Sequence, residues 1–119
     1  MKNYFSRYAQ GYIDQDFTKI EEYFAYPCIL TNECGTDLIC AAADLERHIA
    51  GFLAQLKVGG LAQALPTILH DRLYGQKGRV VSVNWKLKNA DGQRLVDANF
   101  LYVLIDDEGA WKISLVNLL

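Results

Sequence analysis

The sequence is poor in proline, methionine and histidine, and it contains no long apolar run. Among 119 residues there are two prolines, one methionine and two histidines. The longest stretch without a charged residue, 58–70, is interrupted by Gly59, Gly60 and Pro66 and falls short of the roughly 18 to 20 apolar residues of a membrane-spanning helix. We therefore expect no membrane association. Because the N-terminal residues also lack an apolar run of signal-peptide length, we expect a cytoplasmic protein.

An excess of basic charge is missing as well. Twelve lysines and arginines stand against fourteen aspartates and glutamates, which leaves a net charge of -2. A nucleic-acid-binding domain is usually clearly basic, so the balance argues against a nucleic-acid partner. Large disordered segments are excluded too, since 51% of the residues are hydrophobic and 22% are charged.

The sequence has no paired cysteine framework and no metal-binding motif. Cys28, Cys34 and Cys40 are odd in number and spaced by six, which fits neither disulfide pairs nor the short spacing of zinc ligands. Neither His48 nor His70 has a second ligand at a suitable spacing. We expect free thiols, no metal and no cofactor.

The length fits one domain that covers residues 1–119. Its first part shows helical spacing of apolar residues, because Phe5, Tyr8, Ala9 and Tyr12 fall on one side of a helix. A second, short helix is predicted after Asp16, whose side chain can cap it. The residues that follow predict a short strand over 28–33 and a hairpin partner that ends near residue 40.

A third helix is predicted to begin after Asp44 as its cap and to end at Gly59 and Gly60. From about Thr67 onward the pattern becomes alternating, with glycine-containing breaks at 75–78, 91–92 and 108–109. Helices followed by an antiparallel meander predict an α+β fold, in which three N-terminal helices pack on one face of a curved antiparallel sheet.

The turns predict which side chains share a face, because loop length sets the pairing register. A two-residue turn at Asp91 and Gly92 places Trp85 opposite Ala98 and Val81 opposite Tyr102. A similar turn at 108–109 places Tyr102 opposite Leu115 and Phe100 opposite Asn117. For the first long hairpin the register stays open: an even loop at 76–78 turns Ile68, His70, Arg72 and Tyr74 toward the helices, and an odd loop turns Leu69 and Asp71 there instead.

The opposite face of the predicted sheet is mixed instead of polar. Leu95, Leu101, Val103, Val116 and Leu118 are expected there. An antiparallel sheet with one face in water alternates cleanly between apolar and polar residues. Because the helices cover only one face, we predict that a second copy covers the other in an isologous homodimer.

Four segments carry a resemblance to the nuclear transport factor 2-like superfamily, a cone-shaped, cystatin-like fold shared with ketosteroid isomerases and small polyketide cyclases. They are the helix 5–12, the break 14–17, the segment 22–27 and the closing strand 111–115. The resemblance spans nearly the whole chain. It implies a cone between the helices and the sheet in which a small molecule can bind.

Ketosteroid isomerase-like members of that superfamily use a tyrosine on the first helix, an aspartate base at the end of the first strand and a protonated aspartate on the next-to-last strand. In this sequence the resemblance places Tyr8 at the tyrosine and Asn32 at the base. The second aspartate falls on Tyr102, or on Leu101 if the hairpin shifts by one residue. Asn32 cannot accept a proton, and both carboxylates are missing.

Two functions remain open. In the first, a small apolar metabolite binds in the cone and undergoes proton transfer, as in an isomerase, dehydratase or cyclase, with His70, Tyr102 and Asn32 as catalytic residues. In the second, the protein is a non-catalytic module for ligand binding, or for dimerisation through the outer sheet face. The expected pocket residues are Tyr8, Tyr12, Trp85, Phe100, Leu104 and Asn117.

Overall fold

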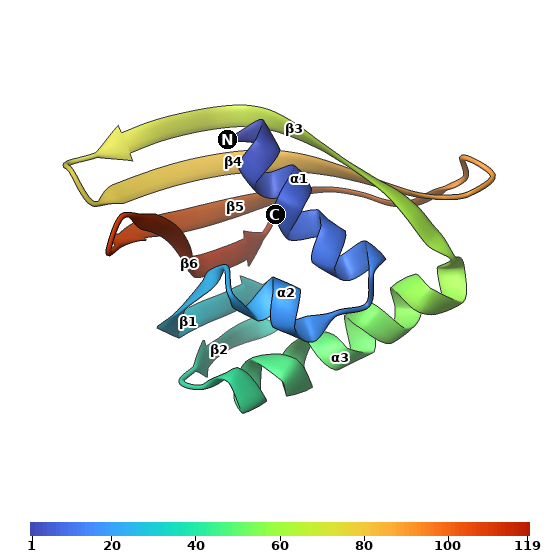
Figure 1. Cartoon of the computed structure of the whole chain (residues 1–119), viewed down its shortest axis with the longest axis horizontal. Helices are drawn as coiled ribbons and strands as arrows, with labels where there is room; N and C mark the ends of the chain where they lie inside the picture. The colour runs from blue at the N-terminus through green and yellow to red at the C-terminus, as the bar shows by residue number, and fades with distance from the viewer.

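Three helices lie on one face of a curved sheet in a computed structural model that describes residues 1–119 (Figure 1). The six strands have the order β2-β1-β6-β5-β4-β3, and every neighbouring pair is antiparallel except β1 and β6. The predicted α+β fold is confirmed, with one parallel pair that the sequence did not indicate. The elements are α1 (Lys2–Ile13), α2 (Phe17–Glu21), β1 (Phe24–Asn32), β2 (Gly35–Ile39), α3 (Ala42–Gly59), β3 (Leu61–Tyr74), β4 (Gly78–Asn89), β5 (Arg94–Asp107) and β6 (Ala110–Leu118).

The ends of the helices follow from local hydrogen bonding. The Asp16 side chain accepts hydrogen bonds from the backbone N–H groups of Thr18 and Lys19, so the predicted cap of α2 is confirmed. Helix α3 begins earlier than predicted: Ala41 is its N-cap, and Asp44 lies in the first turn, where its negative charge still favours the helix dipole. Gly60, with a φ of 74°, ends α3 in the left-handed conformation.

Two strands begin earlier than the sequence pattern indicated. Strand β1 starts at Phe24 instead of residue 28, and β3 starts at Leu61 instead of about Thr67. In β3 the apolar residues before Thr67 do not alternate strictly, because the register against β4 shifts between Leu61 and Gln63. No helix of the structure is long and apolar enough to cross a membrane.

The predicted register between β4 and β5 is confirmed: Trp85 lies opposite Ala98 and Val81 opposite Tyr102. The connection itself is longer than a two-residue turn, since the pairing shifts after Leu87. Between β5 and β6 the predicted register holds only next to the turn. A bulge at Ser114 shifts it by one residue, and Ser114 Oγ donates a hydrogen bond to the Val103 carbonyl (3.2 Å).

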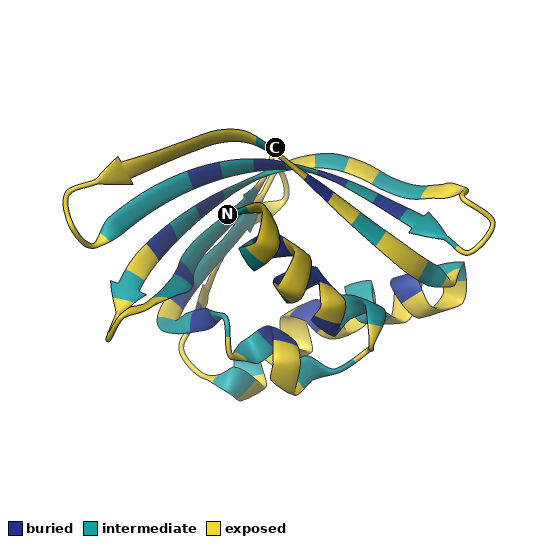
Figure 2. Cartoon of the chain, turned by 45° about the horizontal axis from the view of Figure 1, so that its top comes forward, coloured by how far each residue is buried: buried dark blue, intermediate teal, exposed yellow.

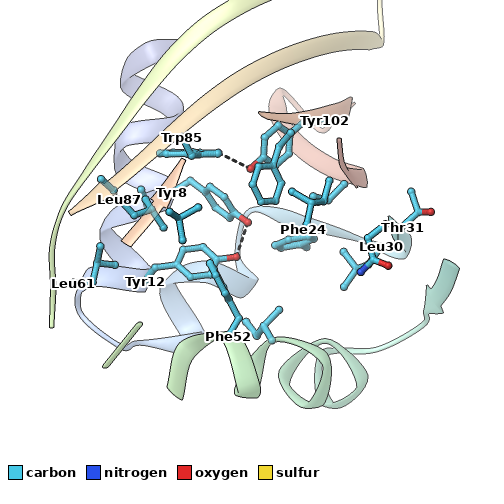
Figure 3. Close-up of a pocket in the computed structure, with 18 residues that line it drawn as sticks. Tyr8, Tyr12, Phe24, Leu30, Thr31, Phe52, Leu61, Trp85, Leu87 and Tyr102 are labelled. Atoms are coloured by element: carbon cyan, nitrogen blue, oxygen red, sulfur yellow. Dashed lines mark hydrogen bonds between the residues drawn. The ribbon is translucent and has the colours of Figure 1, made fainter. Parts of the chain in front are cut away.

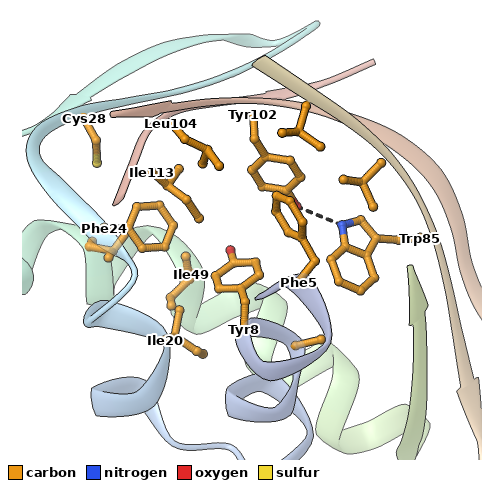
Figure 4. Close-up of a cluster of buried hydrophobic side chains, with 14 of the residues drawn as sticks. Phe5, Tyr8, Ile20, Phe24, Cys28, Ile49, Trp85, Tyr102, Leu104 and Ile113 are labelled. Atoms are coloured by element: carbon orange, nitrogen blue, oxygen red, sulfur yellow. Dashed lines mark hydrogen bonds between the residues drawn. The ribbon is translucent and has the colours of Figure 1, made fainter. Parts of the chain in front are cut away.

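The core lies between the helices and the concave face of the sheet, which we call the inner face (Figure 2). It contains 17 buried hydrophobic residues, and no charged side chain is buried. Aromatic rings from α1 meet those from the sheet; the Phe5 and Tyr102 ring centroids are 4.7 Å apart (Figure 4). This packing anchors α1 on β4 and β5 and leaves space beside it toward α3.

Candidate functional site: an apolar cavity in the cone

A cavity of about 310 Å³ lies between α1, α3 and the inner face of the sheet (Figure 3). Sixteen of its 18 lining residues are hydrophobic, and the other two are Thr31 and Asn32. No carboxylate, histidine, lysine or arginine lines it. The size and composition match those of small-molecule sites, which are mostly apolar and carry few polar groups.

One wall of the cavity carries a buried hydrogen bond between two strands. Trp85 Nε1 on β4 donates to Tyr102 Oη on β5 at 2.8 Å, and both side chains are at most 5% exposed (Figure 3). Burial raises the pKa of Tyr102 far above its ordinary value. The Tyr102 hydroxyl is therefore neutral at physiological pH. Its oxygen is occupied by Trp85, while its own hydrogen has no acceptor within the protein.

A second hydroxyl pair comes from α1. Tyr8 and Tyr12 are one helical turn apart, and their Oη atoms are 2.7 Å from each other. Burial raises the pKa of Tyr12 to about 12 and that of Tyr8 well above its usual range. Two hydroxyls that share one hydrogen bond leave one hydrogen unused. The three tyrosines of the cavity thus hold two spare hydroxyl hydrogens, one from this pair and one from Tyr102.

Asn32 lies at the exposed end of β1, on the rim of the cavity. Its Oδ1 accepts a hydrogen bond from the backbone N–H of Cys34 at 2.8 Å, which fixes the turn into β2. A side-chain amide is not a base near neutral pH, so Asn32 can offer a ligand hydrogen bonds but cannot take a proton from it. Asn32 thus borders the cavity as predicted, but its amide oxygen is already engaged in the turn.

His70 does not reach the cavity, so its predicted place in the cone is wrong. It is exposed and pairs with Ser82 on the outer face of the sheet. The cause is a bulge at Leu69. Between the loop and the bulge, Asp71 lies opposite Val81 and faces the helices, which is the outcome expected for an odd loop. On the other side of the bulge, Ile68 lies opposite Val83 and also faces the helices, which is the outcome expected for an even loop.

Leu104 and Asn117 are also wrongly placed by the sequence analysis. Leu104 is fully buried in the core and does not line the cavity. Asn117 pairs with Leu101 and lies on the outer face, because the bulge at Ser114 moves it there and turns Val116 and Leu118 inward. The remaining predicted residues all line the cavity, namely Tyr8, Tyr12, Asn32, Trp85, Phe100 and Tyr102.

Several lining residues were not proposed as pocket residues from the sequence. Ile49 and Phe52 come from α3, which covers the inner face of the sheet. Phe24 and Leu30 come from β1, whose parallel pairing with β6 brings them next to the cone. No group of three or more histidine, cysteine or acidic residues is arranged to hold a metal ion. All three cysteines are free, and only Cys28 is buried.

A curved sheet that encloses a cavity against three helices defines an NTF2-like, cystatin-like fold. A family model described as "NTF2-like protein (DUF6841)" matches residues 1–117. The chain therefore belongs to this NTF2-like family. The sequence has no significant match among curated proteins.

Solved structures share the fold at low sequence identity. A proposed ketosteroid isomerase from Shewanella frigidimarina NCIMB 400 superposes with a TM-score of 0.75 at 15% identity, over 98% of this chain and 92% of that one. A cystatin-like domain of unknown function from Nostoc punctiforme PCC 73102 gives a TM-score of 0.73 at 13% identity, over 98% and 72%. An NTF2-like protein of unknown function from Shewanella oneidensis MR-1 gives 0.71 at 13%, over 94% and 89%.

Proposed function

We propose that this protein binds a small, neutral, largely apolar molecule in the cone without catalysing proton transfer. The observation that carries the proposal is the lining of the cavity, in which 16 of the 18 residues are hydrophobic and none is charged. An apolar cavity of about 150 Å³ suffices for a benzene-sized molecule. The volume of about 310 Å³ therefore has room for a ligand of about two fused rings.

The lack of a general base argues against the isomerase, dehydratase or cyclase hypothesis. The only ionisable groups in the lining are the hydroxyls of Tyr8, Tyr12 and Tyr102, whose pKa values are all raised by burial. A group that takes a proton near neutral pH needs a pKa close to 7. Asn32 cannot take one, and His70 lies on the other face of the sheet. Ligand binding therefore fits the site better than proton-transfer catalysis.

The hydrogen bonds inside the cavity also favour a particular polar group on the ligand. Tyr102 and the Tyr8–Tyr12 pair each have a hydrogen left to donate, while the Tyr102 oxygen already accepts from Trp85. A carbonyl or ether oxygen complements such donors. A carboxylate or ammonium ion would lose its hydration without gaining an opposite charge. We expect selection for neutral hydrogen-bond acceptors.

The test measures the binding of three naphthalene probes of similar size, either by titration calorimetry or by the quenching of tryptophan fluorescence. We expect 2-acetylnaphthalene to bind more tightly than 2-ethylnaphthalene, and 2-naphthoate to bind at least tenfold more weakly than the ketone. Failure of all neutral probes to bind would refute the proposal. Equal affinity for the ketone and the hydrocarbon would refute only the assigned hydrogen-bond polarity.

A matched pair of variants places the binding in the cone. Ala64 lines the cavity, whereas Ala62 on the same strand is exposed and does not. Ala64→Phe is expected to fill part of the cavity and reduce affinity for 2-acetylnaphthalene at least tenfold. Ala62→Phe is expected to leave the affinity unchanged. The opposite result would place the probe elsewhere on the protein.

A further inference from the structure

A second, open cleft lies where α1 meets the start of β6 and the residues that connect α2 to β1. We call it the side cleft. It shares no lining residue with the cavity in the cone. Three of its lining residues are aromatic and three are charged, namely Tyr4, Tyr23 and Trp111, and Arg7, Glu22 and Lys112. The cone is lined by no charged residue, so the two sites differ in their chemistry.

The aromatic side chains of the side cleft are fixed by their neighbours. Tyr4 Oη donates a hydrogen bond of 3.0 Å to the backbone carbonyl of Trp111. The rings of Tyr4 and Tyr23 meet edge to face, with their centroids 5.3 Å apart. The guanidinium of Arg79 lies over the Trp111 ring, 5.6 Å from its centroid. All three rings of the cleft are only half-buried, so each keeps apolar surface that a flat ligand can cover.

Two cations of the side cleft have no carboxylate partner. Neither Arg7 nor Lys112 forms an ion pair within the protein. The Lys112 ammonium donates one hydrogen to the backbone carbonyl of Glu22, which leaves two hydrogens for a ligand. Glu22 supplies the only carboxylate of the lining, so two positive charges and one negative charge leave an excess of one positive charge. This excess is local, because the whole chain has a net charge of -2.

From these observations we propose that the side cleft binds a small aromatic monoanion such as an arene carboxylate. The ring of the ligand covers the aromatic side chains, and its carboxylate faces Arg7 and Lys112. Arginine matches a carboxylate with two parallel hydrogen bonds, and lysine adds a point charge. Glu22 repels a second negative charge, so a monoanion is favoured over a dianion such as a phosphate monoester. The cone excludes ligands of this class, and the two sites therefore complement each other.

The affinity of the side cleft follows from its exposure. Arg7 and Glu22 are both exposed, so water screens their interaction with a ligand. We expect dissociation constants in the millimolar range and weaker binding than that of the neutral ketone in the cone.

The two tryptophans of the chain allow each site to be observed separately. Trp85 lines the cone (Figure 3), whereas Trp111 lines the side cleft. Their indole N–H groups give two signals in an NMR spectrum of the ¹⁵N-labelled protein, and Trp111→Phe assigns them. We expect benzoate at up to about 20 mM to shift the Trp111 signal in a saturable manner and to leave the Trp85 signal in place. Benzamide, a neutral analogue of similar shape, should bind at least fivefold more weakly.

Three exposed residues supply the variants. Arg7→Gln removes one cation of the cleft and is expected to weaken benzoate binding at least fivefold. Lys2→Gln is the matched control, because Lys2 is exposed on the same helix but does not line the cleft. Glu22→Gln removes the repelling carboxylate and is expected to strengthen benzoate binding at least twofold, a gain that a merely structural role would not produce. Near-UV circular dichroism checks the fold of each variant.

A Trp111 signal that benzoate does not move would overturn the proposal. Equal affinities for benzoate and benzamide would overturn it as well, and so would equal losses in Arg7→Gln and Lys2→Gln, because recognition would then not depend on the cation in the cleft. A shift of the Trp85 signal alone would place benzoate in the cone and overturn it too. Binding of the ketone in the cone is independent of these outcomes, since Trp85 reports it.

Discussion

The inner and outer faces of the sheet alternate along the same strands, yet they differ sharply in burial. On β4, Val81 and Val83 are fully buried and Trp85 is 5% exposed, whereas Ser82 and Asn84 between them are only half-buried. The difference comes from the helices, which cover the inner side alone. A half-buried apolar residue therefore has a different setting on each face: on the inner face many such residues border the cavity, and on the outer face no helix covers them (Figure 2).

The two faces also use polar groups differently. On the inner face, the hydroxyls of the cavity bond to each other or to an indole, and none of them meets a charge. On the outer face, Asn84 Nδ2 donates to the side chains of both Asp97 and Asn99, at 3.0 and 2.8 Å. Water can solvate the second arrangement but not the first. Substitutions that disrupt the inner face should therefore lower the free energy of unfolding more than substitutions on the outer face.

The largest expected difference between the faces comes from two leucine truncations. Leu104→Ala removes a fully buried side chain from the core and is expected to lower the free energy of unfolding by about 2–5 kcal/mol. Leu65→Ala removes a 44% exposed side chain from the outer face and is expected to cost less than about 1 kcal/mol. Urea denaturation at one protein concentration measures both. Equal costs would contradict the assignment of faces.

A smaller effect is expected from Tyr102→Phe. The variant keeps the ring but leaves the buried Trp85 N–H without its acceptor, which is expected to cost about 1–3 kcal/mol. It also removes one spare donor from the cavity. Binding of 2-acetylnaphthalene should weaken toward that of 2-ethylnaphthalene, while binding of the hydrocarbon stays the same. A ketone affinity that does not change would show that Tyr102 donates no hydrogen bond to the ligand.

The bulge at Ser114 gives a prediction about strand register. Since Ser114 is the extra residue, its deletion lets Leu115 follow Ile113 directly and keeps Leu115 opposite Val103. The lost Ser114 hydrogen bond is expected to cost about 1–2 kcal/mol, with the cavity retained. Deletion of Ser82 on regular β4 would instead turn one of the buried valines beside it outward and prevent folding. Circular dichroism and probe binding distinguish the two deletions.

Much of the inner face could be predicted from the sequence. Alternation along β4 and β5 and the glycine turn between them correctly placed Trp85 and Tyr102 on one side, and helical spacing placed Tyr8 and Tyr12 toward them. These are local signals, because a period of two or of 3.6 residues depends only on the segment that carries it.

Two of the three misplaced residues lie where one extra residue enters a strand, whereas Leu104 is on the predicted face but buried in the core. Asn117 follows the bulge at Ser114, and His70 follows the bulge at Leu69. A bulge forms because the partner strand and the curvature of the sheet require it, and neither is visible in the local sequence. One extra residue turns the residues that follow it in the strand to the opposite face of the sheet. For this reason His70, which was expected in the cone, lies outside it.

The smallest expected effect concerns an ion pair at the end of the inner face, beyond the core. Arg79 donates two hydrogen bonds of 2.7 Å to Asp71 and holds the pKa of its carboxyl below the ordinary value. A lowered pKa stabilises the fold at pH values above the pKa of the unfolded chain, and this contribution is lost as the pH falls through the folded-state pKa. Asp71→Asn should cost up to about 1 kcal/mol at pH 7.

The difference between wild type and Asp71→Asn should shrink as the pH falls below about 4, because the wild-type carboxyl then becomes protonated. Asp97→Asn provides the comparison on the outer face, where Asn84 lowers the pKa of a carboxyl that is open to water. Its effect should be smaller, since water replaces the lost partner. Urea denaturation across pH 2–8 follows both variants, and a pH-independent cost for Asp71→Asn would mean that packing, not charge, is responsible.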